Sequence, residues 1–117
     1  MQFEIHFYTE HKNKIGPVER FLESLKAKNG SLWVRTIAGL NKLKHKQYHK
    51  EPLSKSLGCS LWELRIKSEN NILRVIYTFE PGRRIYLLHG FIKKTQKIPE
   101  KELKVAKQRL RSLHEKN

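Results

Sequence analysis

The sequence predicts a single α+β domain with a small mixed, mainly antiparallel sheet, a helical hairpin and a C-terminal helix. Three observations predict this class: an alternating apolar pattern at the N-terminus, two successive helical periodicities, and a meander of three β-rich segments before a last helix. The 117 residues suit one domain with one ordinary core. No repeat, low-complexity tract or linker divides the chain, so residues 1–117 are interpreted as one domain.

The first half of the chain predicts a strand followed by two helices. Residues 2–9 alternate between apolar and polar side chains, as a half-buried strand does. Pro17 suits the first position of a helix, and apolar residues then recur at helical spacing until Gly30 ends the run. Ser31 can cap a second helix that ends near His45. The two helices are expected to form a hairpin.

The second half predicts a polar connection over residues 46–60 and then a three-strand meander. Segments 61–67, 72–79 and 84–93 are rich in Ile, Leu, Val, Tyr and Phe, and turn sequences separate them. Pro99 opens a last helix whose first turn is acidic. The apolar stripe of this helix comprises Leu103, Ala106, Leu110 and Leu113.

The chain is strongly basic, because 25 Lys and Arg residues against 11 Asp and Glu residues give a formal net charge of +14. The excess is greatest in residues 81–117, where eleven basic side chains accompany three acidic ones. Such an excess on a small domain favours a polyanionic partner, either nucleic acid or the ribosome. Solubility alone is the alternative explanation. A membrane surface suits the chain less well, since no segment combines a basic face with a broad, aromatic-rich apolar face.

The sequence also predicts a soluble, cytoplasmic protein with no membrane partner. No stretch approaches the ~20 apolar residues of a membrane span, and the N-terminus lacks the basic-then-apolar pattern of an export signal. The single Cys59 excludes an intramolecular disulfide and a cysteine zinc site, and it is interpreted as a structural residue.

Three sequence blocks carry a resemblance to a known family. They are ELR at 63–65, LRVIY at 73–77 and, most specifically, LLHGFIKKTQKIP at 87–99 followed by a Glu-containing helix. Together with the order of elements, they resemble the HigB branch of the RelE/ParE toxin superfamily, including its phage-derived members. The resemblance covers nearly the whole chain and implies a RelE-like fold. It also implies a toxin of a type II toxin-antitoxin module, a ribosome-dependent endoribonuclease that cuts mRNA and inhibits translation.

The resemblance further implies the partners of the protein. These are the ribosome and mRNA, a HigA-like helix-turn-helix antitoxin that neutralises the toxin, and operator DNA only through the antitoxin complex. Two other functions stay open: a ParE-like, non-nuclease toxin that binds DNA gyrase, and a plain RNA-binding module. Convergence of basic side chains from three strands on one site would favour cleavage.

The chemistry of metal-free RNA cleavage indicates which residue types to seek. A base takes the 2′-hydroxyl proton, cations stabilise the charge on the phosphorane, and an acid protonates the departing 5′-oxygen. The carboxylates Glu63, Glu69 and Glu80 are scattered, and the chain has neither HExxH spacing nor a Gly-rich phosphate loop. No catalytic metal and no other cofactor is therefore expected, and the candidates are mainly basic.

Two neighbouring strands supply the first candidates. Glu63 and Arg65 share the strand face opposite the residues assigned to the core, so both are expected to point outward. Arg65 can contact the scissile phosphate or form an exposed ion pair with Glu63. Related nucleases often carry Lys where Glu63 stands, which argues against proton transfer there. Arg74 interrupts an apolar strand, so it must pair, reach solvent or line a site. It matches the arginine with which RelE-like nucleases stabilise the transition state.

The last strand offers further candidates. Lys93 and Lys94 point to opposite faces, so at most one enters a site on the sheet. The pair stands where the family's C-terminal catalytic cation falls, although a solvated strand end is the alternative. His89 can act as acid or base near neutral pH, or it can be a packing residue. Gly90 permits the close approach of another backbone or marks a bulge.

Cations near and on the last helix form a third group, which can bind ribosomal RNA or be the solvated face of the helix. The predicted RNA- and ribosome-binding residues are Lys97, Lys101, Lys104, Lys107 and Arg111. Arg109 belongs to the same basic stretch.

Overall fold

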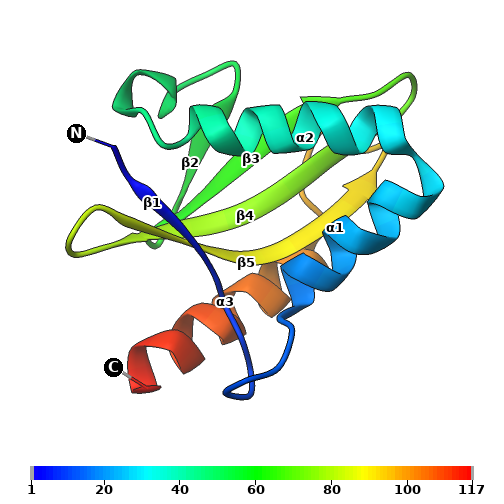
Figure 1. The fold of residues 1–117 in the computed structure, drawn as a ribbon. Helices are drawn as coiled ribbons and strands as arrows, with labels where there is room; N and C mark the ends of the chain where they lie inside the picture. Colours follow the sequence, from blue (N-terminus) through cyan, green and yellow to red (C-terminus); the bar gives the residue numbers. More distant parts are fainter. Residues whose placement is uncertain (1, 117) are drawn as a thin grey trace.

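The helices form two layers on opposite faces of a central sheet in the computed structural model, which describes residues 2–116. Helices α1 (Pro17–Lys28) and α2 (Gly30–Lys42) form a hairpin over one face, and α3 (Glu100–Lys116) covers the other (Figure 1). A short 3-10 helix, η1 (Lys46–Tyr48), follows α2. The predicted α+β class, the helical hairpin and the last helix are confirmed.

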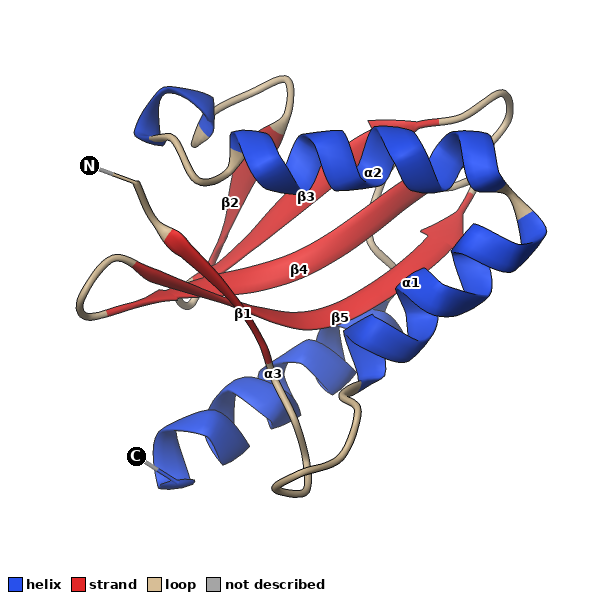
Figure 2. Ribbon diagram, in the orientation of Figure 1, coloured by secondary structure: helices blue, strands red, loops and turns tan. Residues whose placement is uncertain are grey.

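Five strands form the sheet: β1 (Glu4–Phe7), β2 (Ser54–Gly58), β3 (Leu61–Lys67), β4 (Ile72–Glu80) and β5 (Arg84–Lys93). Their spatial order is β1-β5-β4-β3-β2 (Figure 2). Strand β1 pairs in parallel with β5, and the other neighbouring pairs are antiparallel. The prediction of a mixed, mainly antiparallel sheet is therefore confirmed, and the three strands of the meander lie where the sequence placed them.

Strand β2 lies within the segment that the sequence predicted to be a polar connection. It forms the edge of the sheet beside β3, with exposed Lys55 and Ser56 and a register shift before Gly58. Such a short, polar edge strand lacks the apolar alternation by which strands are recognised. The turn to β3 holds Cys59 and Ser60 at positive φ. Cys59 is exposed in this turn and is not part of the buried core, so its interpretation as a structural residue stays a prediction.

The helix boundaries follow local chain chemistry. Helix α1 begins at Pro17, as predicted, because its fixed φ suits the first turn and its missing N–H costs no hydrogen bond there. Helix α2 is capped by Asn29, whose side-chain oxygen accepts a hydrogen bond from the Leu32 amide at 3.1 Å. The cap therefore lies two residues before the predicted Ser31. None of the helices within residues 2–116 combines the length and apolar run needed to cross a membrane.

Both faces of the sheet are buried, which decides the environment of the candidate residues. On the hairpin face, Leu64, Leu73 and Val75 lie in a core with α1 and α2. On the opposite face, Ile76 and Leu88 pack against α3. The α3 residues of this second core include the predicted stripe, Leu103, Ala106, Leu110 and Leu113. The side chains of β3 and β4 that point away from the hairpin thus face α3, whereas the sequence suggested that they face solvent.

Gly90 lies where α1 crosses β5. A Cβ atom at this position would lie 2.6 Å from Cδ2 of Phe21, so the aromatic ring occupies the space above the glycine. The close neighbour is a side chain, where the sequence suggested a backbone. The register shift between β4 and β5 falls nearby, between Ile76 and Tyr77.

Candidate functional site

The α3-facing side of β3 and β4 carries a cluster of Glu63, Arg65 and Arg74, which we call the arginine cluster. Arg65 and Arg74 are directly opposite each other in the β3–β4 register. The carboxylate of Glu63 lies between them: Oε2 is 3.2 Å from Nε of Arg74, and Oε1 is 3.6 Å from Nε of Arg65. One carboxylate thus forms ion pairs with two guanidinium groups.

Burial in the arginine cluster differs from the prediction. Glu63 is 4% exposed and Arg74 is fully buried, so the expectation that Glu63 points outward is wrong. The face that looked free in the sequence is covered by α3 and by the segment that precedes it. Arg65 keeps a side-chain exposure of 19% and forms the open edge of the cluster. Of the outcomes considered for Arg74, the structure shows pairing.

The segment 94–99, between β5 and α3, lies over the arginine cluster. Nη2 of Arg74 donates hydrogen bonds to the backbone carbonyls of Thr95 at 2.7 Å and of Gln96 at 2.6 Å. Nη2 of Arg65 reaches the side-chain oxygen of Gln96 at 3.4 Å. The buried Nε of Arg65, the buried Nε and Nη1 of Arg74, and the buried Oε2 of Glu63 make no hydrogen bond within the described part of the chain. The cluster is consequently rich in donors and short of acceptors.

Burial sets the charge balance of this cluster. It lowers the pKa of Arg74, and the Glu63 carboxylate opposes that change. Burial also raises the pKa of Glu63, while the positive charges of Arg74 and Arg65 oppose the rise. Removal from water therefore disfavours the charged forms of both partners. A second anion beside the two guanidinium groups would favour their protonated state.

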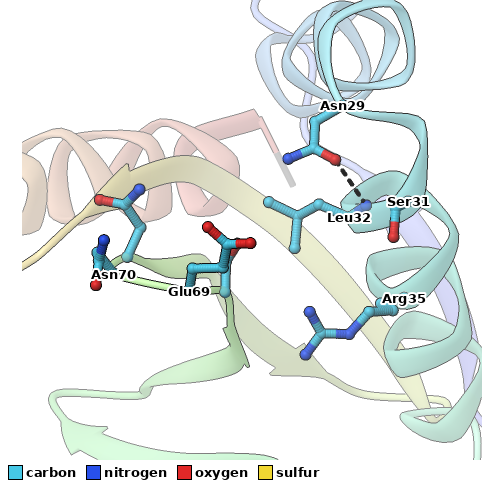
Figure 3. A pocket seen from close by; sticks show the side chains of 8 residues that line it. Asn29, Ser31, Leu32, Arg35, Glu69 and Asn70 are labelled. Carbon is cyan, nitrogen blue, oxygen red and sulfur yellow. Dashed lines mark hydrogen bonds between the residues drawn. The ribbon is translucent and has the colours of Figure 1, made fainter.

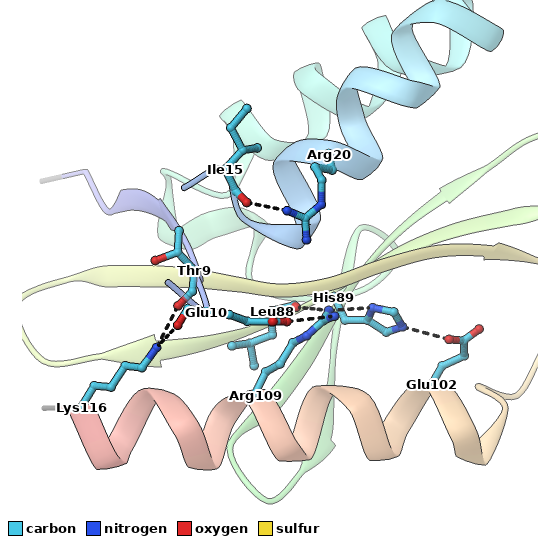
Figure 4. A network of polar contacts seen from close by, with 9 residues as sticks. All are labelled: Thr9, Glu10, Ile15, Arg20, Leu88, His89, Glu102, Arg109 and Lys116. Atoms are coloured by element: carbon cyan, nitrogen blue, oxygen red, sulfur yellow. Dashed lines mark hydrogen bonds and ion pairs between the residues drawn. The ribbon is translucent and has the colours of Figure 1, made fainter. Parts of the chain in front are cut away.

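A second cluster, which we call the histidine cluster, joins β5 to α3 through His89, Glu102 and Arg109 (Figure 4). Nε2 of His89 lies 2.9 Å from Oε1 of Glu102, and Nδ1 lies 3.1 Å from Nη1 of Arg109. Because a guanidinium only donates, Nδ1 must accept, and the ring proton of the neutral imidazole must reside on Nε2. The same Nη1 donates to the carbonyl of Leu88 at 2.9 Å, which anchors Arg109 to β5.

Burial is the main cause that lowers the pKa of His89, and the charge of Arg109 adds to it. The hydrogen bond to Glu102 and the charge of that carboxylate act in the opposite direction. A neutral imidazole with a fixed tautomer results, which is the form that can accept a proton.

Lys93 and Lys94 differ in their surroundings, since β5 ends at Lys93 and Lys94 lies in the segment that follows. Lys93 lies on the α3-facing side, with Nζ 3.9 Å from Oε2 of Glu102, and its side chain is 42% exposed. Lys94 is exposed and lines a hollow at the β3–β4 turn with Glu69 and Asn70. Of the two lysines, Lys93 is the one that shares a face with the two clusters.

One face of the sheet therefore carries both clusters. Phe91 is opposite Arg74 in the β4–β5 register, and it separates His89 from Lys93 along β5. The structure places five of the six predicted catalytic residues on the α3-facing side of the sheet, with Glu63, Arg65 and Arg74 in one group and His89 and Lys93 in another. Lys94 lines a separate hollow.

The sequence did not identify Glu102 and Arg109 as site residues. Glu102 is 8% exposed, and Arg109 is held against β5, so Arg109 does not belong to the surface group in which the sequence placed it. A signal was present, since Glu102, Ala106, Arg109 and Leu113 recur at steps of four, three and four, the spacing of one helix face. The predicted surface cations are exposed: Lys97, Lys101, Lys104, Lys107 and Arg111.

A polar hollow of about 430 Å³ lies between the start of α2 and the β3–β4 turn (Figure 3). Arg35 faces Glu69 and Asn70 across it, and its guanidinium donates to the carbonyl of Lys67. The hollow shares no residue with either cluster. Within residues 2–116, no group of three or more His, Cys, Asp or Glu side chains is placed to hold a metal ion.

Comparison with known proteins finds a family match over most of the chain. Residues 20–111 match a protein family described as "Phage derived protein Gp49-like". The matched range includes most of α1, all of α2 and β2 to β5, most of α3 and every member of the two clusters. Among curated proteins, none matches the chain.

Proposed function

Since the chain belongs to the phage-derived Gp49-like family, part of the HigB-like group of RelE/ParE toxins, we propose that it is a toxin that cleaves mRNA on the ribosome. Cleavage of translated mRNA in the cytoplasm would stop protein synthesis. The reaction we propose requires no metal ion and no cofactor. The observation that carries this proposal is the excess of buried donors in the arginine cluster.

An RNA phosphate supplies what that cluster lacks. Two guanidinium groups share the single carboxylate of Glu63, and three of their buried nitrogens make no hydrogen bond within residues 2–116. Two of these nitrogens have only the ion pairs with Glu63, at 3.2 and 3.6 Å. Phosphate oxygens accept hydrogen bonds from the planar fork of an arginine in a bidentate manner. The phosphate enters at the exposed edge beside Arg65 and displaces the carbonyls of Thr95 and Gln96 from Arg74.

The cleavage step assigns a role to each residue. The 2′-oxygen attacks the neighbouring phosphorus, the bond to the 5′-oxygen breaks, and the products are a 2′,3′-cyclic phosphate and a 5′-hydroxyl. Arg65 and Arg74 stabilise the negative charge of the phosphorane, and Glu63 positions them. His89, neutral and held through Nε2 by Glu102, accepts the 2′-hydroxyl proton at Nδ1 when Arg109 releases that atom. Lys93 protonates the departing 5′-oxygen.

Primer extension on cellular mRNA after brief induction tests this function. We expect discrete cuts within translated regions, and their loss when the start codon of the reporter mRNA is removed. Arg65→Ala should abolish the cuts, whereas Lys12→Ala, in an exposed loop before α1, should leave them unchanged. Growth arrest with intact mRNA and inhibited DNA gyrase would overturn the proposal in favour of a ParE-like activity.

A toxin of this group has a cognate antitoxin, and we propose that the partner is a HigA-like helix-turn-helix protein encoded by a neighbouring gene. The exposed cations of α3 offer it an electropositive surface, and operator DNA is bound only through the complex. Co-expression of the neighbouring gene should restore growth to cells that produce the toxin. Failure of every neighbouring product to bind the purified protein would contradict this assignment.

A further inference from the structure

Four rings from separate parts of the chain meet at one end of the sheet and form what we call the aromatic hollow. Phe3 lies 4.8 Å from His49 and 5.7 Å from Phe79, measured between ring centroids. Phe79 in turn lies 4.9 Å from His49 and 5.4 Å from Trp62. Together with Lys46, these rings line an open hollow of about 370 Å³.

The aromatic hollow is separate from the two clusters. Phe3, Trp62 and Phe79 pack against the core on the hairpin face, while the clusters occupy the face beneath α3. Along β4, Phe79 lies five residues from Arg74, a distance of roughly 16 Å in an extended strand. The rings are partly exposed, in contrast to their neighbour Tyr77, which is fully buried.

Positive charge accompanies these rings. Lys46 lines the hollow, and the guanidinium of Arg83 lies 5.8 Å from the centre of the Phe3 ring. The amide of Phe3 donates to the carbonyl of Lys44 at 2.8 Å, which fixes the segment 42–50 beside the hollow. That segment contains four lysines and no acidic residue, and no acidic side chain lines the hollow.

We infer that the aromatic hollow binds one unpaired base of a single-stranded RNA. Surfaces that bind single-stranded nucleic acid combine ring faces, on which bases stack, with cations that follow the phosphate backbone. Because the Trp62 and Phe79 rings meet at 82°, the base stacks on the face of Trp62 and meets Phe79 at an angle. The adjoining phosphates lie near Lys46 and Arg83. The positive rim favours RNA over an apolar protein segment as the occupant. This site lies outside the reaction proposed above and requires only that the protein meets RNA.

Trp62 fluorescence tests the inference directly, since Trp33 and Trp62 are the two tryptophans of the chain. The probe is a short 2′-O-methyl oligoadenylate, which lacks the attacking hydroxyl, so a failure of binding is distinguishable from a failure of cleavage. In Trp33→Phe, the remaining emission comes from Trp62, and the oligonucleotide should quench it. In Trp62→Phe, the remaining emission comes from Trp33, and the oligonucleotide should not quench it. Phe79→Leu, which keeps apolar volume but removes the ring, should weaken binding roughly tenfold.

Three results would overturn the inference. Equal quenching by the same oligonucleotide in a duplex would mean that phosphate attraction alone is responsible. Quenching confined to Trp33 would place the RNA on another surface. If Trp62 responds only when the co-expressed antitoxin is bound, the hollow belongs to a protein partner. Lys46→Ala provides a second measure, because loss of one phosphate contact should lower the slope of log Kd against log salt by about one.

Discussion

At the scale of single residues, Arg74 combines a structural and a proposed chemical role. It neutralises the buried Glu63 carboxylate and holds the backbone of Thr95 and Gln96. Arg74→Ala should therefore lower the free energy of unfolding by about 3–5 kcal/mol, because one buried charge loses its partner. It should also reduce cleavage by whatever remains folded by about a hundredfold. Denaturant unfolding and single-turnover cleavage measure the two effects.

A paired substitution separates the two roles of Arg74. In Glu63→Leu/Arg74→Met, the buried charge pair is replaced by apolar side chains of similar volume, so most of the lost stability should return. Cleavage should stay at the level of Arg74→Ala. Recovery of cleavage together with stability would show that Arg74 acts only through the fold.

His89 gives the protein a specific dependence of stability on pH. Its pKa is lowered in the folded state, so between that value and the ordinary value of about 6.5 the unfolded chain binds more protons. The free energy of unfolding should rise with pH through this window and fall as the pH drops below about 6.5. Urea unfolding across the window should show a shallower dependence for His89→Gln. An identical dependence in both proteins would contradict the buried, neutral state of this imidazole.

At the scale of elements, the contact between α1 and β5 depends on Gly90. A methyl group there would meet three atoms of the Phe21 ring at 2.6, 2.9 and 3.2 Å, so the whole ring must shift. Gly90→Ala should cost about 1–3 kcal/mol of stability, measured by thermal unfolding.

Gly30→Ala is the matched control for that substitution. No atom lies within 4 Å of the added methyl group, so the change should be neutral or slightly stabilising. Combining Gly90→Ala with Phe21→Leu should cost less than the sum of the single changes, because both act on one contact. Additive costs would place the strain elsewhere.

The elements with strong periodicity could be predicted from the sequence, and those that depend on tertiary context could not. Strands β3 to β5 combine apolar runs with turn residues at both ends, so their bounds agree closely with the prediction. Strand β2 is recognisable only through its pairing with β3. The sequence identified Leu103 to Leu113 as an apolar stripe, but it could not show which sheet face that stripe covers.

Because the sequence did not show which sheet face α3 covers, the predicted and observed burial of the site residues differ. Alternation correctly placed Glu63 and Arg65 on one face of β3, yet the burial of Glu63 depends on the segment 94–99 and on α3. The link between His89 and Glu102 joins two elements that alternation and helical spacing describe separately. Sequence patterns therefore predicted the orientation of side chains within elements better than the contacts between elements.

At the scale of the whole molecule, the net charge of +14 should make RNA binding strongly dependent on salt. Replacing the exposed α3 cations Lys101, Lys104, Lys107 and Arg111 by glutamine should weaken ribosome binding and flatten the slope of log Kd against log salt. The expected change is about one unit for each cation that contacts phosphate.

A second set of four exposed lysines, Lys12, Lys14, Lys26 and Lys28, provides the control with the same change in net charge. These residues lie in the loop before α1 and near the end of that helix. If their replacement flattens the slope equally, the attraction arises from total charge and not from the surface of α3.

The parallel pairing of β1 with β5 has a consequence for the time at which the protein becomes active. Glu4 is aligned with Arg84, so the strand synthesised first acquires its partner only after the rest of the sheet has been made. Closing so large a loop is entropically costly and slows folding. His89 and Glu102 follow later still along the chain. A nascent chain therefore lacks an assembled histidine cluster during translation of its own mRNA. This order of synthesis delays any activity that depends on the histidine cluster.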